Sequence, residues 1–410
     1  MANQQQEGAL TGTKVLDLSR ILAGPWAGQM LADLGAEVVK VERPKVGDDT
    51  RTWGPPFLEA SDKNQDERVA AYFHSANRGK RSIAIDFTLP EGQKLVQQLA
   101  LQSDVFIENY KFGGLKKYGL DYDTLKVINP KLIYCSITGF GQTGPYKERA
   151  GYDFMIQAMG GLMSVTGEPD GSPMKSGVAL TDILTGLYAS NAIQAALLYR
   201  YRTGAGQHID MALLDVQVAA MANQAMNYLA THKSPERLGN AHPNIVPYQA
   251  FATSDNHFIL AIGNDAQFKR FCDVGGCQHL CEDERFATNQ SRVANRKMLI
   301  PMIQKVLKTK TRKWWLEALE KVAVPCGPIN NLEQVFEDDQ VQHRGLKLSL
   351  KHPTLGTVPS VANPIRFSES PITYDQASPS LGADTKSVLK ESLQVSDKIL
   401  QELREKGVLG

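Results

Sequence analysis

Apolar and polar residues alternate along the first 140 residues in a way that predicts an α/β sheet. Short apolar runs, each typical of a buried strand, occur at residues 15–18, 37–41, 82–86, 105–108 and 132–137. Between them, apolar residues recur at helical spacing at residues 25–34, 91–101 and 122–127. Strands that alternate with helices favour parallel pairing through crossover connections, so we expect a Rossmann-like α/β domain here.

Helical patterns dominate the middle of the chain, at residues 152–166, 182–201 and 213–229, with a short strand expected at 208–211. The pattern of apolar residues changes from helical to strand-like near residue 244. Two strand patterns, at 248–253 and 257–262, flank a polar turn formed by Ser254, Asp255 and Asn256. This arrangement predicts a hairpin that opens a second domain.

Further helices are expected at residues 266–271, 296–307 and 312–322, and further strands at 347–350 and 358–361. The last helical pattern, at 396–406, needs an apolar surface to cover, and we expect this surface to be the N-terminal sheet. We therefore predict a large Rossmann-like domain formed by residues 1–223 with 345–410. Residues 224–344 are predicted to form a smaller α+β domain with its linkers.

Composition agrees with two globular domains. The 410 residues exceed the roughly 250 to 300 at which a single core stops growing. Hydrophobic residues make up 42% and charged residues 22% of the chain, the mixture typical of a soluble globular protein. Because 45 Lys and Arg balance 44 Asp and Glu, the net charge of +1 offers no field for a nucleic acid, and we expect no such partner.

The sequence also bears on where the protein is located in the cell. The most apolar segment, 177–198, is interrupted by polar residues such as Thr181 and Asn191, so we expect a buried helix and not a membrane span. No Lys or Arg precedes Lys14, and the five cysteines are an odd number. Both features favour the cytoplasm, or the mitochondrial matrix if a leader has been removed.

A metal site is not expected. Three cysteines and a histidine lie close together in the sequence, namely Cys272, Cys277, His279 and Cys281. Their spacings match no common zinc pattern, and no second ligand pair is near. Partly buried thiols around a turn at Gly275 and Gly276 are the interpretation we favour.

A nicotinamide cofactor is not expected either. The pattern G-x-G-x-x-G occurs at Gly139, Gly141 and Gly144, directly after a predicted strand. A dinucleotide fingerprint requires a helix to begin there and an acidic residue about twenty positions later, and neither is indicated. We interpret the segment as a flexible loop at the carboxyl edge of the sheet, where open α/β folds bind ligands.

Several residues are candidates for binding an anionic ligand. Residues 19–25 connect the first strand to the first helix through small side chains that would let a ligand approach closely. Arg43 ends the second strand, and the lysine cluster Lys111, Lys116 and Lys117 follows the strand at 105–108. These cations could meet phosphates, although solvated surface charge is the commoner role of such residues.

Asp182 is the most notable carboxylate because it stands at the start of a long apolar helix. One interpretation is an N-cap, in which its oxygens accept hydrogen bonds from the first helical turn. The other is a nucleophile that attacks a carbonyl carbon, with the helix N-terminus helping to keep the carboxylate ionised. The pattern of residues does not choose between them.

The chain also resembles the class III coenzyme A transferases over nearly its whole length. The similar segments are residues 15–20 (VLDLSR), 22–25 (LAGP), 34–42 (LGAEVVKVE), 47–51 (GDDTR), 77–82 (NRGKRS), 104–109 (DVFIEN), 136–141 (SITGFG) and 151–153 (GYD). Within the family, the pattern is most similar to members that use succinyl-CoA and glutarate or related dicarboxylates. The segments that carry this are residues 50–57 (TRTWGPPF), 245–251 (IVPYQAF) and 327–331 (GPINN).

The resemblance implies that Asp182 is the nucleophile and that the reaction passes through an aspartyl-CoA thioester. It implies that CoA moves from an acyl-CoA donor such as succinyl-CoA to a carboxylic acid such as glutarate, without a metal or nicotinamide. It further implies a ring-shaped subunit in an interlocked homodimer. The residues that it places around the CoA substrate are Leu22, Ala23, Arg43, Asn109, Lys117, Tyr152 and Asp153.

Two related activities remain as alternatives. Racemases that act on 2-methylacyl-CoA have a histidine where Tyr152 stands, and a phenol with a pKa of about 10 is a poor substitute at neutral pH. Oxalate enzymes have a glutamine where Leu22 stands and an acidic residue corresponding to Asp153. The distal carboxylate of a longer diacid could be met by one of the cations Arg20, Arg51, Arg78, Arg149 and His242.

Overall fold

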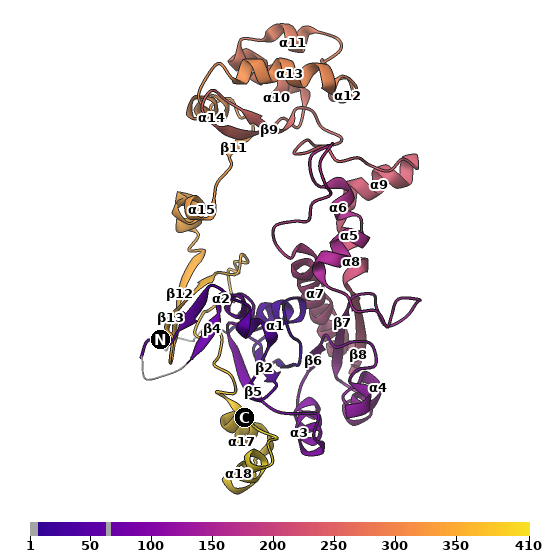
Figure 1. The fold of residues 1–410 in the computed structure, drawn as a ribbon, viewed down its shortest axis with the longest axis vertical. Helices are drawn as coiled ribbons and strands as arrows, with labels where there is room; N and C mark the ends of the chain where they lie inside the picture. The colour runs from indigo at the N-terminus through magenta and orange to yellow at the C-terminus, as the bar shows by residue number, and fades with distance from the viewer. Residues whose placement is uncertain (1–6, 63–66) are drawn as a thin grey trace. The chain divides into compact units, whose positions relative to one another are not determined.

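The computed structural model describes residues 7–62 and 67–410. It divides into two compact units, each shown in Figure 1. The first unit consists of Met1–Gly161, Ser176–Ala225 and Gln340–Gly410, and the second of Leu162–Lys175 and Met226–Asp339. The sequence placed residues 162–175 in the large domain, whereas the structure groups them with the smaller unit.

A six-stranded sheet forms the centre of the first unit. Its strands are β1 (Lys14–Asp17), β2 (Glu37–Glu42), β5 (Lys80–Ala84), β6 (Val105–Glu108), β7 (Ile133–Thr138) and β8 (Gln207–Ala212). Their order is β5-β2-β1-β6-β7-β8, and every neighbouring pair is parallel. This order confirms the predicted Rossmann-like sheet, and its direction of winding reverses between β1 and β6, where such folds bind ligands.

Alternate residues of each strand face two different apolar layers. Val15, Val38 and Ile107 pack with helices α1 (Ala23–Asp33) and α7 (Leu180–Thr203). Leu16 and Phe106 face the other layer. That layer contains α3 (Pro90–Leu101), α4 (Tyr122–Ile128), α17 (Thr385–Leu393) and α18 (Asp397–Glu405). The sheet is therefore covered on both faces, as a parallel sheet requires.

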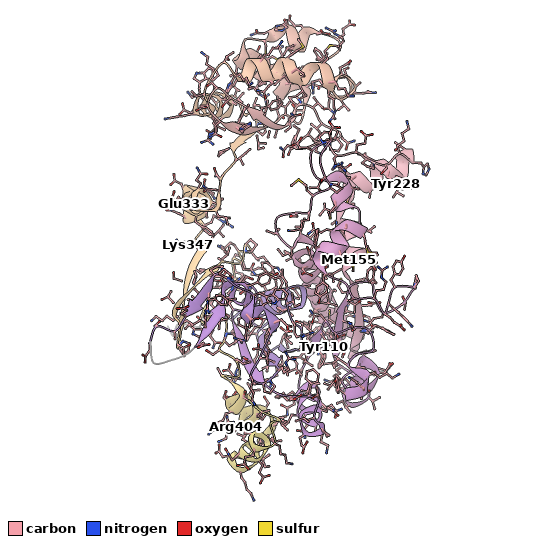
Figure 2. The ribbon with its side chains drawn as sticks, viewed as in Figure 1. Tyr110, Met155, Tyr228, Glu333, Lys347 and Arg404 are labelled. Carbon is pink, nitrogen blue, oxygen red and sulfur yellow. The ribbon has the colours of Figure 1, made fainter. Side chains whose placement is uncertain are left out.

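The C-terminal segment returns to this unit. Strands β12 (Lys347–His352) and β13 (Gly356–Val361) form an antiparallel hairpin. Leu400 and Leu403 of α18 are buried in the same core as Leu16, so the prediction that the last helix covers the N-terminal sheet is confirmed. Figure 2 labels Arg404 on this helix and Lys347 at the start of β12.

Shorter elements complete the first unit. They are the 3-10 turns η1 (Asp49–Thr52) and η2 (Lys116–Tyr118), the antiparallel pair β3 (Phe57–Glu59) and β4 (Arg68–Ala70), and the helices α2 (Ala71–His74), α5 (Asp153–Met159) and α8 (Leu213–Ala220). Helix α9 (Ala222–Thr231) begins in it and α16 (Asp339–His343) begins at its boundary. The helix predicted over residues 152–166 is interrupted at Gly160 and Gly161, where α5 ends and α6 (Leu162–Val165) follows.

Helix α7 differs from its predicted environment. It was expected to be buried, but only one face is. Ala189 and Ile193 lie in the core, whereas Leu198 is 67% and Tyr201 is 91% exposed. No helix in the part of the chain that the structure describes is long and apolar enough to cross a membrane.

The second unit contains a three-stranded sheet of order β11-β10-β9. Strands β9 (Tyr248–Ala252) and β10 (His257–Ala261) form the predicted antiparallel hairpin, and β11 (Cys326–Pro328) adds to it. This unit contains α6, most of α9, and the helices α10 (Asp265–Gly275), α11 (Gln278–Glu282), α12 (Asn289–Ala294), α13 (Arg296–Leu307), α14 (Arg312–Glu320) and α15 (Leu332–Glu337). Cys272 and Cys277 are buried in its core.

Candidate active site

A cavity of about 530 Å³ lies in the first unit, at the carboxyl ends of several strands. Arg43 follows β2, Asn109 follows β6, and Thr138 ends β7. The cavity therefore occupies the edge at which the Rossmann-like topology predicts a ligand. The predicted nucleophile Asp182 lines it, and so do the seven residues that were predicted to surround the substrate: Leu22, Ala23, Arg43, Asn109, Lys117, Tyr152 and Asp153.

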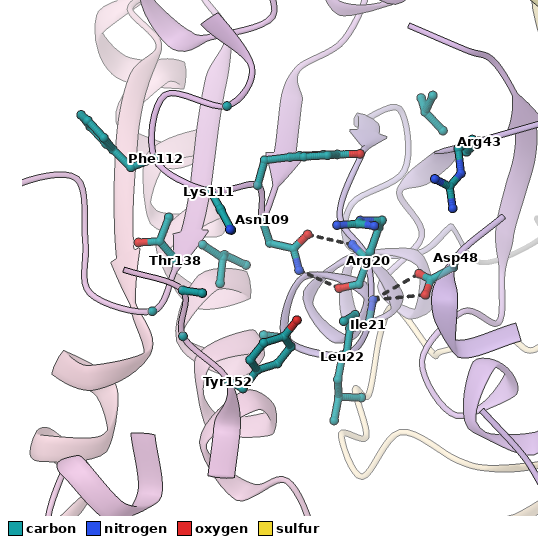
Figure 3. A pocket seen from close by; sticks show the side chains of 18 of the residues that line it. Arg20, Ile21, Leu22, Arg43, Asp48, Asn109, Lys111, Phe112, Thr138 and Tyr152 are labelled. Atoms are coloured by element: carbon teal, nitrogen blue, oxygen red, sulfur yellow. Dashed lines mark hydrogen bonds between the residues drawn. The ribbon is translucent and has the colours of Figure 1, made fainter. Parts of the chain in front are cut away.

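The turn between β1 and α1 forms one wall of the cavity (Figure 3). The side chain of Asn109, the residue directly after β6, holds this turn. Its Oδ1 accepts a hydrogen bond from the Arg20 backbone N–H at 2.8 Å, and its Nδ2 donates to the Arg20 carbonyl oxygen at 2.6 Å. These two bonds engage both the oxygen and the nitrogen of the Asn109 amide. Asn109 therefore supports the cavity wall in addition to lining the cavity.

Asp182 lies in the cavity wall as the third residue of α7. Helix α7 begins at Leu180, two residues earlier than the pattern predicted, and its N-cap is Ala179. The N-cap interpretation of Asp182 is therefore wrong. Within the described residues, the Asp182 carboxylate has no hydrogen-bond partner, which leaves its oxygens available to a substrate.

Asp153 supplies the missing cap from another helix. Its Oδ1 accepts hydrogen bonds from the N–H groups of Thr181, at 2.8 Å, and Asp182, at 3.2 Å. Gln157, one turn along α5, donates to the other oxygen of Asp153 at 2.7 Å. Because an acidic side chain at a helix N-terminus satisfies its free N–H groups, Asp153 performs the role that the sequence offered to Asp182.

The electrostatic environment of Asp182 also differs from expectation. Burial, and then the negative charge of Asp153, raise the pKa of Asp182 to about 7. The expected help from the helix N-terminus does not prevail, because the N–H groups of the first turn point to Asp153. A carboxylate with a raised pKa is more basic, and it is the sort of group that performs chemistry near neutral pH.

Tyr72, on α2, is a neighbour that the sequence did not suggest. Burial, followed by the charges of Asp182 and Asp153, raises the pKa of Tyr72, so its hydroxyl lies in the field of the acidic pair. Its ring meets that of Trp53 edge to face, with 5.5 Å between centroids. Only tertiary packing brings this short helix near α7, and no local pattern in the sequence indicates it.

Cations and aromatic rings line the remainder of the cavity. Besides Arg43 and Lys117, it is lined by Lys111, Lys147 and Arg149. Lys116, from the same predicted cluster, lines a neighbouring cavity. The additional lining residues that the sequence reasoning missed include Phe87, Tyr110, Phe112 and Lys147. The run Lys147-Glu148-Arg149 after the glycine-rich loop is the one local signal that could have drawn attention to Lys147.

Three of the cations proposed for a distal carboxylate are already paired, two of them with buried acids. Arg51 donates to both oxygens of Glu42, at 2.8 and 2.7 Å, and Arg78 donates to both oxygens of Asp33, at 2.8 and 2.7 Å. Both pairs are buried. Arg20, which donates to the part-exposed Asp49 at 3.0 Å, and Arg149 line the cavity. His242 belongs to the second unit.

The glycine pattern at residues 139–144 forms a loop after β7, as predicted, and no helix begins there. A Cβ atom added to Gly139 would lie 2.5 Å from the Cα of Gly151. The two backbones thus meet more closely than side chains allow, and this contact places Tyr152 and Asp153 beside the sheet edge. In the second unit, Cys281 is half-buried, and no group of metal-binding residues is found among the described residues.

A doubly wound sheet with a free carboxylate and a row of cations at its switch point is suited to group transfer on an anionic substrate. CoA-transferase family III matches residues 10–385, so the chain belongs to this family of transferases. It is 55% identical over 386 residues to the succinate–glutarate CoA-transferase of Agrobacterium fabrum (strain C58), covering 93% of this chain and 95% of that protein.

Two further proteins are similar over almost the whole chain. The human succinyl-CoA:glutarate CoA-transferase is 45% identical over 400 residues, covering 98% of this chain and 90% of that protein. The crystal structure of a CAIB/BAIF family protein from Brucella suis superimposes with a TM-score of 0.83 at 56% identity. It covers 94% of this chain and 100% of that one.

Proposed function

We propose that this enzyme transfers CoA from succinyl-CoA to glutarate, with Asp182 as the nucleophile. The names of the relatives from Agrobacterium fabrum and human support the two substrates. The observation that carries the proposal is the Asp182 carboxylate itself. It lies in the wall of a cavity rimmed by cations, while Asp153 satisfies the helix N-terminus in its place.

The first half of the reaction charges the enzyme with CoA. An Asp182 oxygen attacks the thioester carbonyl of succinyl-CoA, the C–S bond breaks, and a mixed aspartyl–succinyl anhydride and CoA thiolate result. The thiolate then attacks the aspartyl carbonyl, the anhydride C–O bond breaks, and succinate leaves. Asp182 now carries CoA as a thioester, so one difficult substitution has become two easier ones.

The second half repeats these steps with the acceptor. A glutarate carboxylate attacks the aspartyl thioester, which releases CoA thiolate and forms an aspartyl–glutaryl anhydride. The thiolate attacks the glutaryl carbonyl, so glutaryl-CoA forms and the Asp182 carboxylate is restored. One thioester is made for each one broken, and therefore neither ATP nor water enters the balance.

The remaining predicted residues bind the CoA substrate. Arg43 and Lys117 would meet the nucleotide phosphates, because a guanidinium and an ammonium both pair with phosphate oxygens. Leu22 and Ala23 would lie against the thioester, and Tyr152 beside the acyl group. Arg149 lines the same cavity and would receive the distal carboxylate of a diacid, together with Arg20, which is paired with the part-exposed Asp49.

We also propose an interlocked homodimer. Supporting this, α7 exposes large apolar side chains, including Leu198 and Tyr201, that a second copy of the chain would cover. Light scattering at micromolar concentration should give twice the chain mass, and a monomer would contradict the proposal.

Five free cysteines favour a reducing compartment, and we propose the cytoplasm.

One experiment tests the reaction and its intermediate together. The protein is incubated with succinyl-CoA and a panel of acids, namely glutarate, oxalate, itaconate, malate and carnitine, and the CoA esters are identified by mass. We expect glutaryl-CoA as the main product, and without an acceptor we expect CoA attached to the peptide that contains Asp182. Exchange of an α-proton with deuterated solvent, without CoA transfer, would indicate a racemase instead.

A further inference from the structure

The backbone of Ile21 has a conformation that an isoleucine rarely adopts. Its φ angle is +73°, in the left-handed region that favours glycine, and β-branched residues are especially uncommon there. Ile21 lies in the turn between β1 and α1, directly before the cavity residues Leu22 and Ala23. A turn of this kind persists only where its surroundings hold it.

Asp48 holds this turn. Both of its carboxylate oxygens accept a hydrogen bond from the Ile21 N–H, at 3.2 and 3.3 Å, as Figure 3 shows. Its Oδ1 also accepts from the backbone N–H of Thr50 at 3.0 Å, which fixes Asp48 at the start of η1. The Asp48 carboxylate is therefore bonded both to the backbone of η1 and to the backbone of the turn at Ile21.

Lys40 completes the arrangement from strand β2. Its Nζ lies 2.9 Å from Asp48 Oδ2 and donates to the Ser19 carbonyl oxygen at 2.7 Å. The side chains of Lys40 and Asp48 are both 0% exposed. Two successive peptide groups of the turn, on either side of Arg20, are thus bonded to one buried ion pair.

The start of α1, directly after this turn, packs closely against α7. A Cβ atom added to Gly186 of α7 would lie only 2.7 Å from the carbonyl oxygen of Ala23. Gly186 is one helical turn after Asp182. A shift of the turn at Ile21 would therefore move Leu22 and Ala23 relative to the nucleophile.

We propose that Asp48 is a positioning residue for the CoA-transfer reaction: by holding the left-handed turn at Ile21, it fixes Leu22 and Ala23 opposite Asp182. This rests on the proposed function of the cavity. Asp48 acts through the backbone and need not touch the reacting atoms. Because small displacements of reacting groups cost large factors in rate, its loss should lower kcat more than it weakens CoA binding.

The test compares Asp48→Asn with Asp33→Asn. Asp33 is the matched control, since it is a buried acid of the same unit paired with Arg78 and it does not line the cavity. We expect Asp48→Asn to lower kcat at least about tenfold, with the Kd for CoA by calorimetry changed less than about threefold. Asp33→Asn should lower Tm but leave kcat within about threefold. Equal kcat in the two variants would overturn the proposal.

Ile21→Gly supplies an independent readout, because glycine adopts a positive φ without cost. In that background, Asp48→Asn should lower kcat less than about threefold, so that the two substitutions are coupled. The same loss in both backgrounds would contradict a role through the turn. Should wild-type protein transfer no CoA, the proposed function fails.

Amide hydrogen exchange on the wild-type protein tests the contact itself and requires neither activity nor a stable variant. A slowly exchanging Ile21 N–H is expected, since it is bonded to a buried carboxylate. Exchange as fast as that of an exposed loop would overturn the proposal.

Discussion

Asp153 of α5 accepts the hydrogen bonds of the α7 N-terminus, so the carboxylate of Asp182 on α7 does not. Asp153 Oδ1 lies 3.2 Å from the backbone nitrogen of Asp182 and 2.8 Å from that of Thr181, so it caps α7 in place of Asp182. The Asp182 carboxylate is left without a hydrogen-bond partner among the described residues. Its negative neighbour and its burial then make it more basic.

The pH dependence of the reaction should report this environment. With the pKa of Asp182 raised to about 7, kcat/KM for the donor should fall as the pH drops below about 7, because the protonated acid is not a nucleophile. Asp153→Asn removes the neighbouring charge and should move this acid limb to lower pH. Asp215→Asn, at an exposed first-turn acid of α8, is the control and should leave the limb in place. An unchanged limb in Asp153→Asn would contradict the electrostatic explanation.

Ionisation of Asp182, which activity requires, should lower the stability of the folded protein. The folded-state pKa of Asp182 lies above its model-peptide value of 3.8, so folding favours the protonated form and ionisation destabilises the folded state. This destabilisation grows from about pH 4 and is complete above about pH 7. Asp182→Asn should therefore raise Tm more at about pH 8 than at about pH 5 in calorimetry. An equal change at both pH values would mean that Asp182 is not desolvated.

Removal of the nucleophile should abolish transfer. We expect Asp182→Ala to lower kcat by at least about a thousandfold, since the proposed covalent intermediate forms on the Asp182 carboxylate. The CoA ester formed by the variant would be measured by mass spectrometry. The Kd for CoA should change little. Retention of most of the transfer rate would rule out Asp182 as the nucleophile.

Lys117 and Lys116 offer a matched pair for phosphate binding. They are adjacent in η2, but Lys117 lines the large cavity and Lys116 the neighbouring one. Lys117→Gln should weaken CoA binding by about 5- to 50-fold, with a reduced dependence on salt, as expected for a charge-assisted contact. Lys116→Gln should change it less than about threefold. Equal effects in a calorimetric titration would remove Lys117 from the phosphate site.

Close packing of α1 on α7 can be tested at a glycine. A Cβ at Gly186 would lie 2.7 Å from the Ala23 carbonyl oxygen, whereas one at Gly177 would meet nothing within 4 Å. Gly186→Ala should therefore destabilise the protein by about 1–3 kcal/mol in denaturant unfolding and lower kcat. Gly177→Ala should leave both nearly unchanged. A stabilised Gly186→Ala would mean that helix propensity outweighs the clash.

The sequence by itself determined the sheet, because apolar runs and helical spacing are local properties of the chain. Residues 105–108 and 296–307 were predicted with the bounds that β6 and α13 have in the structure. It also indicated the ligand edge, since the carboxyl ends of parallel strands must lie together. The residues taken from the family resemblance all line that edge.

Tertiary structure alone decided which acid caps α7, which arginines pair with buried acids and how Ile21 is held. A local pattern cannot show that Asp153, 29 residues before Asp182, accepts the bonds of the first helical turn. Nor can it show that Arg51 and Arg78 are committed to Glu42 and Asp33. These outcomes depend on contacts between distant segments, whose energies are set by burial and by the distance between charges.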